Sequence, residues 1–276
     1  MRVALIQLNA SDDPLANLPV TQGYVNEAAE SGARFVLTPE VTNCLSASRA
    51  RQIEVLHHEA DDPTLAALRG TAAAHGIWLL IGSLALKTDD ADVRFANRSF
   101  LIDPKGEIRA RYDKIHMFDV EVSETETYRE SAGYRPGTKA VLANMDGTAL
   151  GMTICYDLRF AALYRKLAQA GAQILTVPSA FSSVTGTAHW ETLLRARAIE
   201  SGAFVLAPAQ TGTHGGSQGA LRKTYGHAMA VAPWGEVLAD GGTEPGITMV
   251  DLELAKVEDA RRRIPSLQHD RPIEGP

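Results

Sequence analysis

One arrangement of hydrophobic and polar positions occurs four times along the chain. A segment compatible with a helix ends at a glycine, a short apolar run follows, and a proline, serine or carboxylate comes next. The glycine suits a left-handed helix C-terminal cap, and the run has the length of a strand buried on both faces. This pattern predicts alternating helices and buried strands. The four copies are SGARFVLTPE (Ser31–Glu40), HGIWLLIGS (His75–Ser83), AGAQILTVPS (Ala170–Ser179) and SGAFVLAPAQ (Ser201–Gln210).

The segments between these runs carry apolar residues at three- and four-residue spacing, which is typical of helices with one buried face. Helices are expected at Leu15–Ser31, Pro63–His75, Phe160–Ala170 and Ala188–Ser201. Further strands are expected at Val3–Leu8, Arg94–Ile102, Ala149–Cys155, His227–Val231 and Ile247–Leu252. So many strands and so few helices fit two sheets with helices on their outer faces better than one doubly wound sheet. We therefore predict the α/β class, as a four-layer α-β-β-α sandwich that forms a single domain.

Two segments lack the periodicity of a helix or a strand. They are Asp119–Thr138, which is acidic, and Thr211–Lys223, which is rich in glycine. Long irregular segments in a compact domain are usually functional or disordered. We expect both segments to be loops near the active site; the sequence leaves open whether they close over a substrate.

Composition and charge narrow the class of protein. The chain is 45% hydrophobic and 22% charged, as in ordinary globular proteins, and no run approaches the roughly 20 apolar residues that span a membrane. Its formal net charge of −6 argues against nucleic acid as the main partner. Two cysteines are too few for a disulfide framework, and MRVALIQLNA lacks the features of a secretory leader, so we expect a cytoplasmic location.

Cys155 stands where an apolar strand candidate passes into a helix candidate, in the stretch MTICYDLRF. At such a junction a nucleophile can project from the carboxyl end of a sheet toward the amides of the next helix. A buried structural thiol is the alternative, because free cysteine is among the most buried residue types. That alternative is stronger for Cys44, which lies in the polar stretch TNCLSAS with no strand-to-helix junction behind it.

A cysteine nucleophile needs a base or a nearby cation, because a thiol with a pKa of about 8.5 is mostly protonated at neutral pH. The eight histidines offer no evident partner, which argues against a papain-like site, and HHEADD lacks the spacing of zinc ligands. Glu40 is the better candidate base, since it closes the run FVLTPE at the carboxyl end of an interior strand. Lys114 in RYDKIHMF is a candidate cation. Considered individually, Glu40 and Lys114 could each also be a solvated surface residue.

Three stretches together resemble the nitrilase superfamily, the carbon–nitrogen hydrolases with a Glu-Lys-Cys triad. They are TPE with Glu40, YDKIHMFD with Lys114 and ICYDLRF with Cys155. Stretches similar to its Nit-type amidase branch follow in order: DVEV and ES before RPG, then AHWETLLRARAIESGAFVLAPAQ, then YGHAMAVAPWGEVLAD. The resemblance runs nearly end to end. It implies a carbon–nitrogen hydrolase domain over residues 1–276, the same sandwich fold, homodimers or larger homo-oligomers, and no metal or organic cofactor.

The resemblance also implies a role for each residue of the site. Cys155 is the nucleophile that forms a thioester, and Glu40 is the proton carrier for both halves of the reaction. Lys114 and the amide N–H of Tyr156 stabilise the negative oxygen of the tetrahedral intermediate. Glu130, in the ES pair, is a second carboxylate that positions Lys114 or the reacting amide.

Another interpretation remains open for Glu130, and the sequence departs from the family pattern in two places. Glu130 could instead be a loop acid paired with Arg135. The helix after the cysteine reads RFAALYRKL where many relatives have RFPELYR, which changes the start of the helix but keeps Arg159 in place. The stretch SETETYRES is less hydrophobic than expected around an amide site, and this bears on the substrate and not on the reaction.

The Nit-type resemblance implies hydrolysis of the terminal carboxamide of a small anionic α-keto acid amide, with release of ammonia. An anionic substrate requires cations in the site. The segment AQTGTHGGSQGALRKTYGH is more similar to the deaminated glutathione branch, so we favour that substrate over α-ketoglutaramate, the substrate of ω-amidases, and over other amides or nitriles. The candidate substrate-binding residues are Arg159, Arg197, Arg222 and Lys223, and a helix-surface or interface role is an equal alternative for Arg195 and Arg197.

A catalytically idle scaffold of the same fold is the alternative outside the enzymes. It predicts that one residue of the triad is missing, and none is missing. The sequence therefore favours an enzyme whose partner is a small-molecule amide and which binds neither nucleic acid nor membrane.

Overall fold

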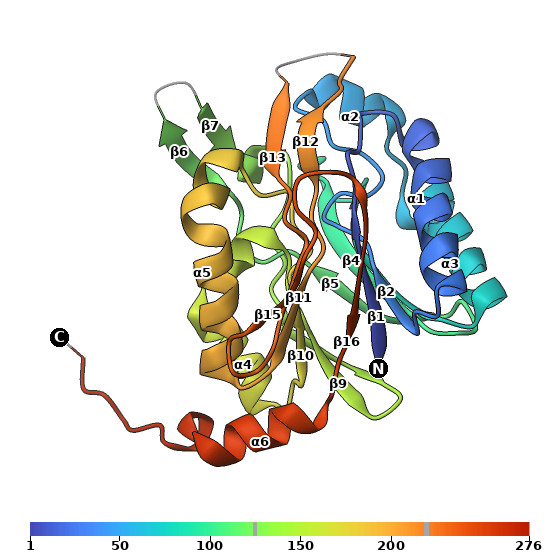
Figure 1. The fold of residues 1–276 in the computed structure, drawn as a ribbon. Helices are drawn as coiled ribbons and strands as arrows, with labels where there is room; N and C mark the ends of the chain where they lie inside the picture. The colour runs from blue at the N-terminus through green and yellow to red at the C-terminus, as the bar shows by residue number, and fades with distance from the viewer. Residues whose placement is uncertain (124–125, 218–220, 276) are drawn as a thin grey trace.

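Two six-stranded β-sheets pack face to face in the computed structural model, which describes residues 1–123, 126–217 and 221–275 (Figure 1). The strands of the first sheet are, in spatial order, β16 (Gly246–Asp251), β1 (Arg2–Gln7), β2 (Phe35–Leu37), β3 (Trp78–Leu86), β4 (Ala96–Ile102) and β5 (Ile108–Asp113). Those of the second are β15 (Val237–Asp240), β14 (Met229–Val231), β11 (Phe204–Ala207), β10 (Ile174–Thr176), β9 (Thr148–Met152) and β8 (Val141–Met145).

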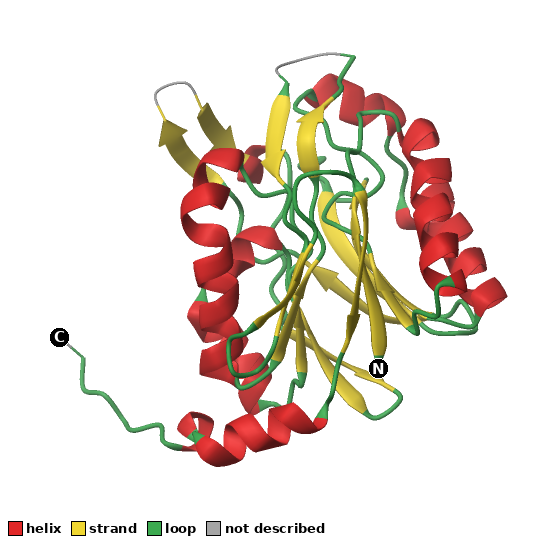
Figure 2. Cartoon of the chain, in the orientation of Figure 1, coloured by secondary structure: helices red, strands yellow, loops and turns green. Residues whose placement is uncertain are grey.

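Helices cover the outer face of each sheet (Figure 2). The first sheet carries α1 (Pro14–Glu30) and α3 (Pro63–His75), and the second carries α4 (Ala161–Gln169) and α5 (Ser183–Ser201). This arrangement confirms the predicted four-layer α-β-β-α sandwich. The remaining helices are α2 (Arg49–Val55), α6 (Ala255–Arg263) and the 3-10 turns η1 (Glu59–Asp61), η2 (Glu130–Ala132), η3 (Cys155–Arg159) and η4 (Ser266–Gln268).

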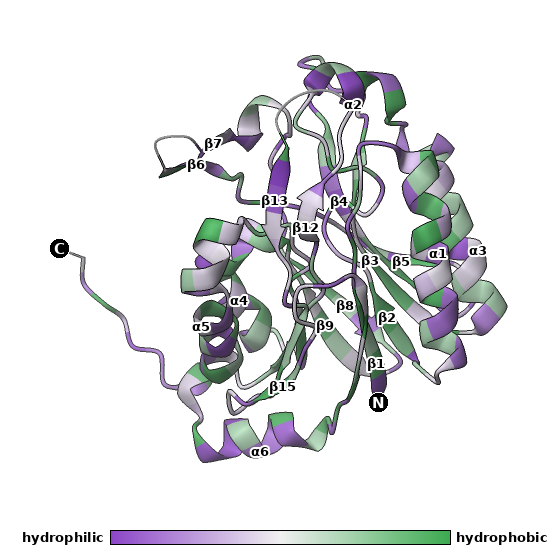
Figure 3. Ribbon diagram, turned by 45° about the horizontal axis from the view of Figure 1, so that its top comes forward, coloured by the Kyte–Doolittle hydropathy of each residue, from purple (hydrophilic) through white to green (hydrophobic). Residues whose placement is uncertain are grey.

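The alternation of side chains along each strand explains how the layers pack together. In β1, Val3 and Leu5 belong to the core between the two sheets, whereas Ala4 and Ile6 pack with the helices of the first sheet. Successive side chains of a strand point to opposite faces, so a strand that is apolar at every position is buried on both. Figure 3 shows that hydrophobic residues are common in the strands of the two sheets. No helix within the described residues combines the length and apolar character needed to cross a bilayer.

Capping residues explain where the main helices begin and end. Asp13 and Asp62 accept backbone N–H groups of α1 and α3, and a proline occupies the first turn of each helix. Gly76 and Gly202 end α3 and α5 in the left-handed region that the repeated pattern predicts, with φ of 61° and 53°. The largest difference from the predicted helix boundaries is in α5, which begins at Ser183 and not at Ala188, whereas the ends of α1 and α4 differ by one residue.

The prediction that Asp119–Thr138 and Thr211–Lys223 are irregular is wrong for most of their described residues. The first contains an antiparallel pair, β6 (Asp119–Ser123) with β7 (Glu126–Arg129), and the second contains β12 (Thr211–His214), which pairs with β13 (Arg222–Tyr225). These short strands have no buried apolar face, so the hydrophobic pattern does not reveal them. Positions 124–125 and 218–220 lie outside the described residues.

Gly82 lies where the two sheets approach each other. A Cβ atom added there would lie 2.0 Å from the carbonyl oxygen of Thr38 and 2.5 Å from Cβ of Pro178. Thr38 follows β2 in the first sheet, and Pro178 follows β10 in the second. Only glycine therefore permits this contact without displacing the backbone that leads to Glu40.

The variant Gly82→Ala should lower the free energy of unfolding by about 1–3 kcal/mol, because overpacking displaces well-packed neighbours. Gly70 in α3 is the matched control, since a Cβ there would meet no atom within 4 Å. Gly70→Ala should stabilise the protein by about 0.5–1 kcal/mol, the usual gain within a helix. Urea unfolding of both variants measures the difference; equal stability would contradict the close contact.

Candidate active site

A cavity of about 580 Å³ opens at the end of the sandwich that carries the two hairpins, and Glu40, Lys114 and Cys155 all line it. These residues come from three distant parts of the chain. Glu40 follows β2, Lys114 follows β5, and Cys155 follows β9. Segments from both hairpins also line the cavity, which agrees with the expected position of these segments beside the site.

The backbone at Cys155 turns sharply. Strand β9 ends at Met152, Cys155 has φ of 48°, and the turn η3 begins at this residue. A positive φ is uncommon for any residue but glycine, and such residues cluster at functional sites. The amide N–H of Cys155 donates to the carbonyl of Pro178 at 3.0 Å, whereas that of Tyr156 has no acceptor among the described residues. The Tyr156 N–H is therefore free to bind an oxygen near the thiol.

The carboxylate of Glu40 is buried and fully hydrogen-bonded. One oxygen, Oε2, accepts the backbone N–H of Ala180 at 2.8 Å. The other, Oε1, accepts Nζ of Lys114 at 2.8 Å and Nδ2 of Asn97 at 2.9 Å. Donors from both sheets thus fix the position of this carboxylate, as a buried charge requires.

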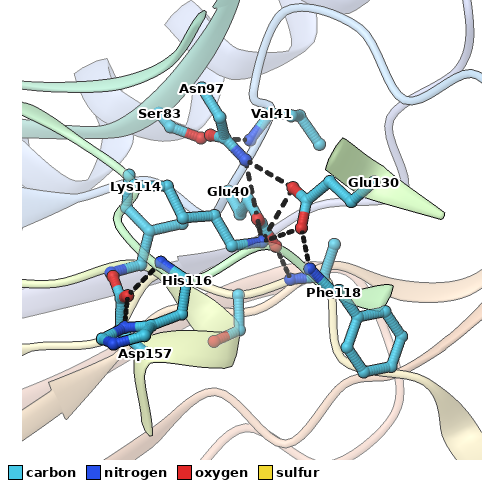
Figure 4. A network of polar contacts seen from close by, with 12 residues as sticks. Glu40, Val41, Ser83, Asn97, Lys114, His116, Phe118, Glu130 and Asp157 are labelled. Atoms are coloured by element: carbon cyan, nitrogen blue, oxygen red, sulfur yellow. Dashed lines mark hydrogen bonds and ion pairs between the residues drawn. The ribbon is translucent and has the colours of Figure 1, made fainter. Parts of the chain in front are cut away.

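Lys114 lies between two carboxylates (Figure 4). Besides its contact with Glu40, Nζ donates to both oxygens of Glu130 at 2.9 and 2.8 Å. Glu130 Oε2 also accepts the backbone N–H of Phe118 at 2.6 Å. Arg135, the alternative partner of Glu130, pairs instead with Asp90 and Asp113. Glu130 is therefore placed to position Lys114.

These contacts set the charge of each group. Burial acts to lower the pKa of Lys114, but the charges of Glu130 and Glu40 outweigh it and raise this pKa well above its ordinary value. Burial acts to raise the pKa of Glu40, but Lys114 and then Arg222 lower it overall. Burial, followed by the charge of Glu40, raises the pKa of the Cys155 thiol. The resting site thus holds an ammonium, a carboxylate and a neutral thiol.

Arg222 is the predicted substrate-binding residue that lines the cavity. Its guanidinium donates to the carbonyl of Ala180 at 2.8 Å and lies over the ring of Tyr128, 5.5 Å from the centroid. Arg159 does not line the cavity; its guanidinium lies over the rings of Tyr156 and Phe181, which do. Of Arg159 and Arg222, only Arg222 lines the cavity.

Two of the expected substrate-binding residues lie away from the cavity. Arg197 is buried and donates to the carbonyl of Leu158 at 2.9 Å and to Glu200 at 2.8 Å, so its guanidinium holds the turn after Cys155 and does not line the cavity. Lys223 is exposed on the opposite face of β13 from Arg222. Arg195 donates to Gly235 on the surface, as its alternative reading expects.

Sequence reasoning missed several groups of the site. Asn97 bridges the two carboxylates by donating to Glu40 and, at 3.4 Å, to Glu130. A polar amide at a buried position of strand β4 is a signal that could have revealed it. The backbone donors of Ala180 and Phe118 leave no mark in a sequence. Among the described residues, no group of three or more His, Cys, Asp or Glu side chains could hold a metal ion.

Comparison with known proteins adds an independent finding. Residues 2–262 match the family described as carbon-nitrogen hydrolase. A protein of Yersinia enterocolitica named deaminated glutathione amidase is 40% identical over 270 residues, which cover 98% of this chain and 92% of that protein.

Solved structures agree with the sequence match. The NitFhit protein of C. elegans superposes with a TM-score of 0.89 at 34% identity, over 98% of this chain, which spans 65% of that longer chain. An amidase from Nesterenkonia sp. AN1, solved as a variant with acrylamide added at its active site cysteine, superposes with a TM-score of 0.77 at 29% identity over 96% of this chain and 98% of that one. The fold, the converging residues and these matches establish that the chain belongs to the carbon-nitrogen hydrolase family.

Proposed function

We propose that this protein is an amidase that hydrolyses the terminal carboxamide of deaminated glutathione through a thioester at Cys155. The observation that carries the proposal is the convergence of a thiol, a carboxylate and an ammonium in one cavity. The similar protein from Yersinia enterocolitica supports the substrate, since it is named deaminated glutathione amidase. The similar amidase from Nesterenkonia sp. AN1 supports a reactive cysteine.

In the first half of the reaction, Cys155 attacks the carboxamide carbon while Glu40 takes the thiol proton. The carbonyl π electrons move onto its oxygen, which becomes negative. The ammonium of Lys114 and the amide N–H of Tyr156 donate hydrogen bonds to this oxygen. When the tetrahedral intermediate collapses, the carbon–nitrogen bond breaks, Glu40 returns its proton to the leaving nitrogen, and ammonia departs.

In the second half, Glu40 takes a proton from water, and the hydroxide attacks the thioester carbon. The carbon–sulfur bond then breaks, the sulfur regains a proton from Glu40, and the product leaves as a carboxylic acid that ionises. A single carboxylate serves both halves because each half begins and ends with Glu40 ionised. The lowered pKa of Glu40 keeps its carboxyl group ionised at the start of each half.

Glu130 has a separate task in this mechanism. Lys114 faces the negative charges of both carboxylates, which keep it a cation although it is buried. A cation beside the thiol opposes the effects that raise the pKa of Cys155. Glu130 therefore holds Lys114 charged and in place without contacting the reacting carbon.

Arg222 is proposed to bind the anionic part of the substrate. It borders the same cavity as Cys155 and influences the charge state of Glu40, so its cation lies near the reacting groups. The chemistry that it suits is a carboxylate or a keto oxygen of the amide substrate.

Three alternatives are less well supported. α-Ketoglutaramate would use the same triad and the same cation, and a nitrile could also be attacked by this thiol. An idle scaffold would not be expected to keep a buried ammonium bonded to two carboxylates next to a cysteine, because burying charges is costly. Homo-oligomerisation and the cytoplasmic location stay predictions from the sequence.

Kinetics on three amides test the substrate. The catalytic efficiency kcat/KM should be highest for deaminated glutathione, lower for α-ketoglutaramate and lowest for neutral propionamide. Saturating, rapid hydrolysis of α-ketoglutaramate with little activity on deaminated glutathione would overturn the assignment.

The variant Arg222→Gln should raise KM for deaminated glutathione by about 10- to 100-fold, the usual effect of losing a hydrogen bond to a charged group. Hydrolysis of propionamide should change little. Because Arg222 lowers the pKa of Glu40, its loss raises that pKa, and the acidic limb of the kcat/KM profile should move to higher pH. The control is Lys223→Gln, which removes the same charge from the exposed face of β13. Equal effects of the two variants would contradict the role of Arg222.

A further inference from the structure

The carboxylate of Asp157 is a buried charge that the mechanism above does not use. It lies two residues after Cys155 in the turn η3 and is fully inaccessible to solvent. It does not line the cavity, so it has no access to substrate. A buried carboxylate is costly unless several donors satisfy it, so its partners indicate what it does.

Asp157 accepts hydrogen bonds from two different segments of the chain. Oδ2 accepts the backbone N–H of Ile154 at 2.9 Å and the hydroxyl of Tyr112 at 2.6 Å. Oδ1 accepts the backbone N–H of His116 at 3.0 Å and lies 2.7 Å from Nδ1 of the same residue (Figure 4). Burial and the charge of Asp157 raise the pKa of Tyr112, so this hydroxyl keeps its proton and stays a donor.

The positions of these donors relative to the triad are informative. Ile154 directly precedes Cys155, whereas Tyr112 and His116 flank Lys114 at two residues on either side. Tyr112 belongs to β5 in the first sheet, and the Ile154 segment continues β9 of the second sheet. One carboxylate therefore joins the segment that carries the nucleophile to the segment that carries the ammonium.

Aromatic stacking provides a second contact between these two segments. The ring of His116 lies parallel to that of Phe160, with centroids 3.5 Å apart and an interplanar angle of 6°. Phe160 follows η3, so the stack joins the same two segments a second time. Movement of the Lys114 segment would have to break both this stack and the bonds to Asp157.

We propose that Asp157 is a positioning residue that sets the distance between the sulfur of Cys155 and Nζ of Lys114. This inference rests on the proposed amidase mechanism, in which both groups act on the same carbonyl. Lys114 stabilises the thiolate and the oxyanion only at short range, and a misplacement of about 1 Å can cost roughly 100-fold in rate. Asp157 contributes to catalysis through this geometry alone.

The variant Tyr112→Phe tests the proposal, because it removes one donor to Asp157 and leaves the aromatic ring in the core. It should lower kcat about 10-fold or more with little change in KM, since the substrate contacts remain. Lys114 acts to lower the pKa of Cys155, so a displaced Lys114 lets that pKa rise. The pH profile for alkylation of Cys155 by acrylamide should therefore move to higher pH.

Tyr164→Phe is the matched control. Tyr164 is also fully buried, and its hydroxyl bonds Thr153 Oγ1 at 2.6 Å, two residues before Cys155. This bond does not involve the Lys114 segment. Both variants should lower the melting temperature similarly, whereas only Tyr112→Phe should shift the alkylation profile and lower kcat. Equal kinetic effects, or a wild-type alkylation profile in Tyr112→Phe, would overturn the proposal.

Asp157→Asn provides a second variant. Its amide NH₂ cannot accept a hydrogen bond, so the bonds at one carboxylate oxygen are lost, and a larger drop in kcat, about 100-fold, is expected. Acrylamide alkylates a thiol by Michael addition to its carbon–carbon double bond, so this readout does not depend on amide hydrolysis. If deaminated glutathione proves not to be hydrolysed, the alkylation profiles still decide whether Asp157 positions Lys114 against Cys155.

Discussion

Replacing Cys155 with alanine is expected to lower kcat for amide hydrolysis by about 10⁴-fold or more. The reason is chemical: without the sulfur no thioester forms, and water would have to attack an unactivated amide. Cys155→Ser should be nearly as inactive, because a hydroxyl is a much weaker nucleophile than a thiolate. Initial rates of ammonia release at saturating substrate measure both variants, and circular dichroism shows whether they are folded.

Cys44 provides the control for this result. It also lines the cavity, and burial raises the pKa of its thiol to about 12. The charges that act on Cys44 come from Asp12, Arg51 and Asp13, so it lacks the proton carrier and the ammonium that Glu40 and Lys114 supply at Cys155. Acrylamide should therefore label Cys44→Ala at Cys155, whereas Cys155→Ala should stay unlabelled under the same conditions. Activity of Cys155→Ala near that of the unaltered protein would exclude the covalent mechanism.

Replacing Glu40 with glutamine is expected to lower kcat by about 10²- to 10⁴-fold, the usual contribution of a general acid–base group. Glutamine can accept a hydrogen bond but cannot carry a proton from the thiol to the leaving nitrogen. Lys114 keeps Glu130 as a partner in this variant, so the buried ammonium is not left unpaired. The protein should therefore remain folded, with a melting temperature that differs little from that of the unaltered chain.

The reactivity of the thiol should respond differently from turnover in Glu40→Gln. The charge of Glu40 raises the pKa of Cys155, so removing this charge lowers that pKa and increases the thiolate fraction at a given pH. Acrylamide should therefore still label Cys155 in the variant although hydrolysis is slow. Loss of both labelling and turnover would show that Glu40 is needed for the structure of the site and would contradict its role as proton carrier.

The sequence predicts the fold well because the interior strands are apolar at nearly every position. The run FVLTPE predicts both strand β2 and the placement of Glu40 at its end, and the structure agrees. The hairpins escape this reasoning because their short strands are largely polar. For the same reason the sequence does not choose between Arg222 and Lys223: neighbouring residues of a strand face opposite sides, and only the strand pairing decides which one faces the cavity.

The triad itself could be predicted, but the groups that hold it could not. Arg197 occupies a helix position that suits either substrate contact or structure, and only its bond to Leu158 decides. Asn97 and Asp157 are polar residues whose side-chain partners are distant in sequence, so their roles depend on the contact between the sheets. Gly82 belongs to the same class, because the close approach that it permits involves both sheets.

Acid-quenched peptide mass spectrometry tests the central mechanism most directly. Protein turning over deaminated glutathione is quenched with acid, digested and mapped, with Glu40→Gln analysed in parallel because slow hydrolysis of its thioester favours accumulation. We predict that the substrate acyl group, having lost ammonia, is attached to the peptide that contains Cys155. An acyl group on the peptide that contains Cys44, or turnover with no adduct on Cys155 in either protein, would contradict the mechanism.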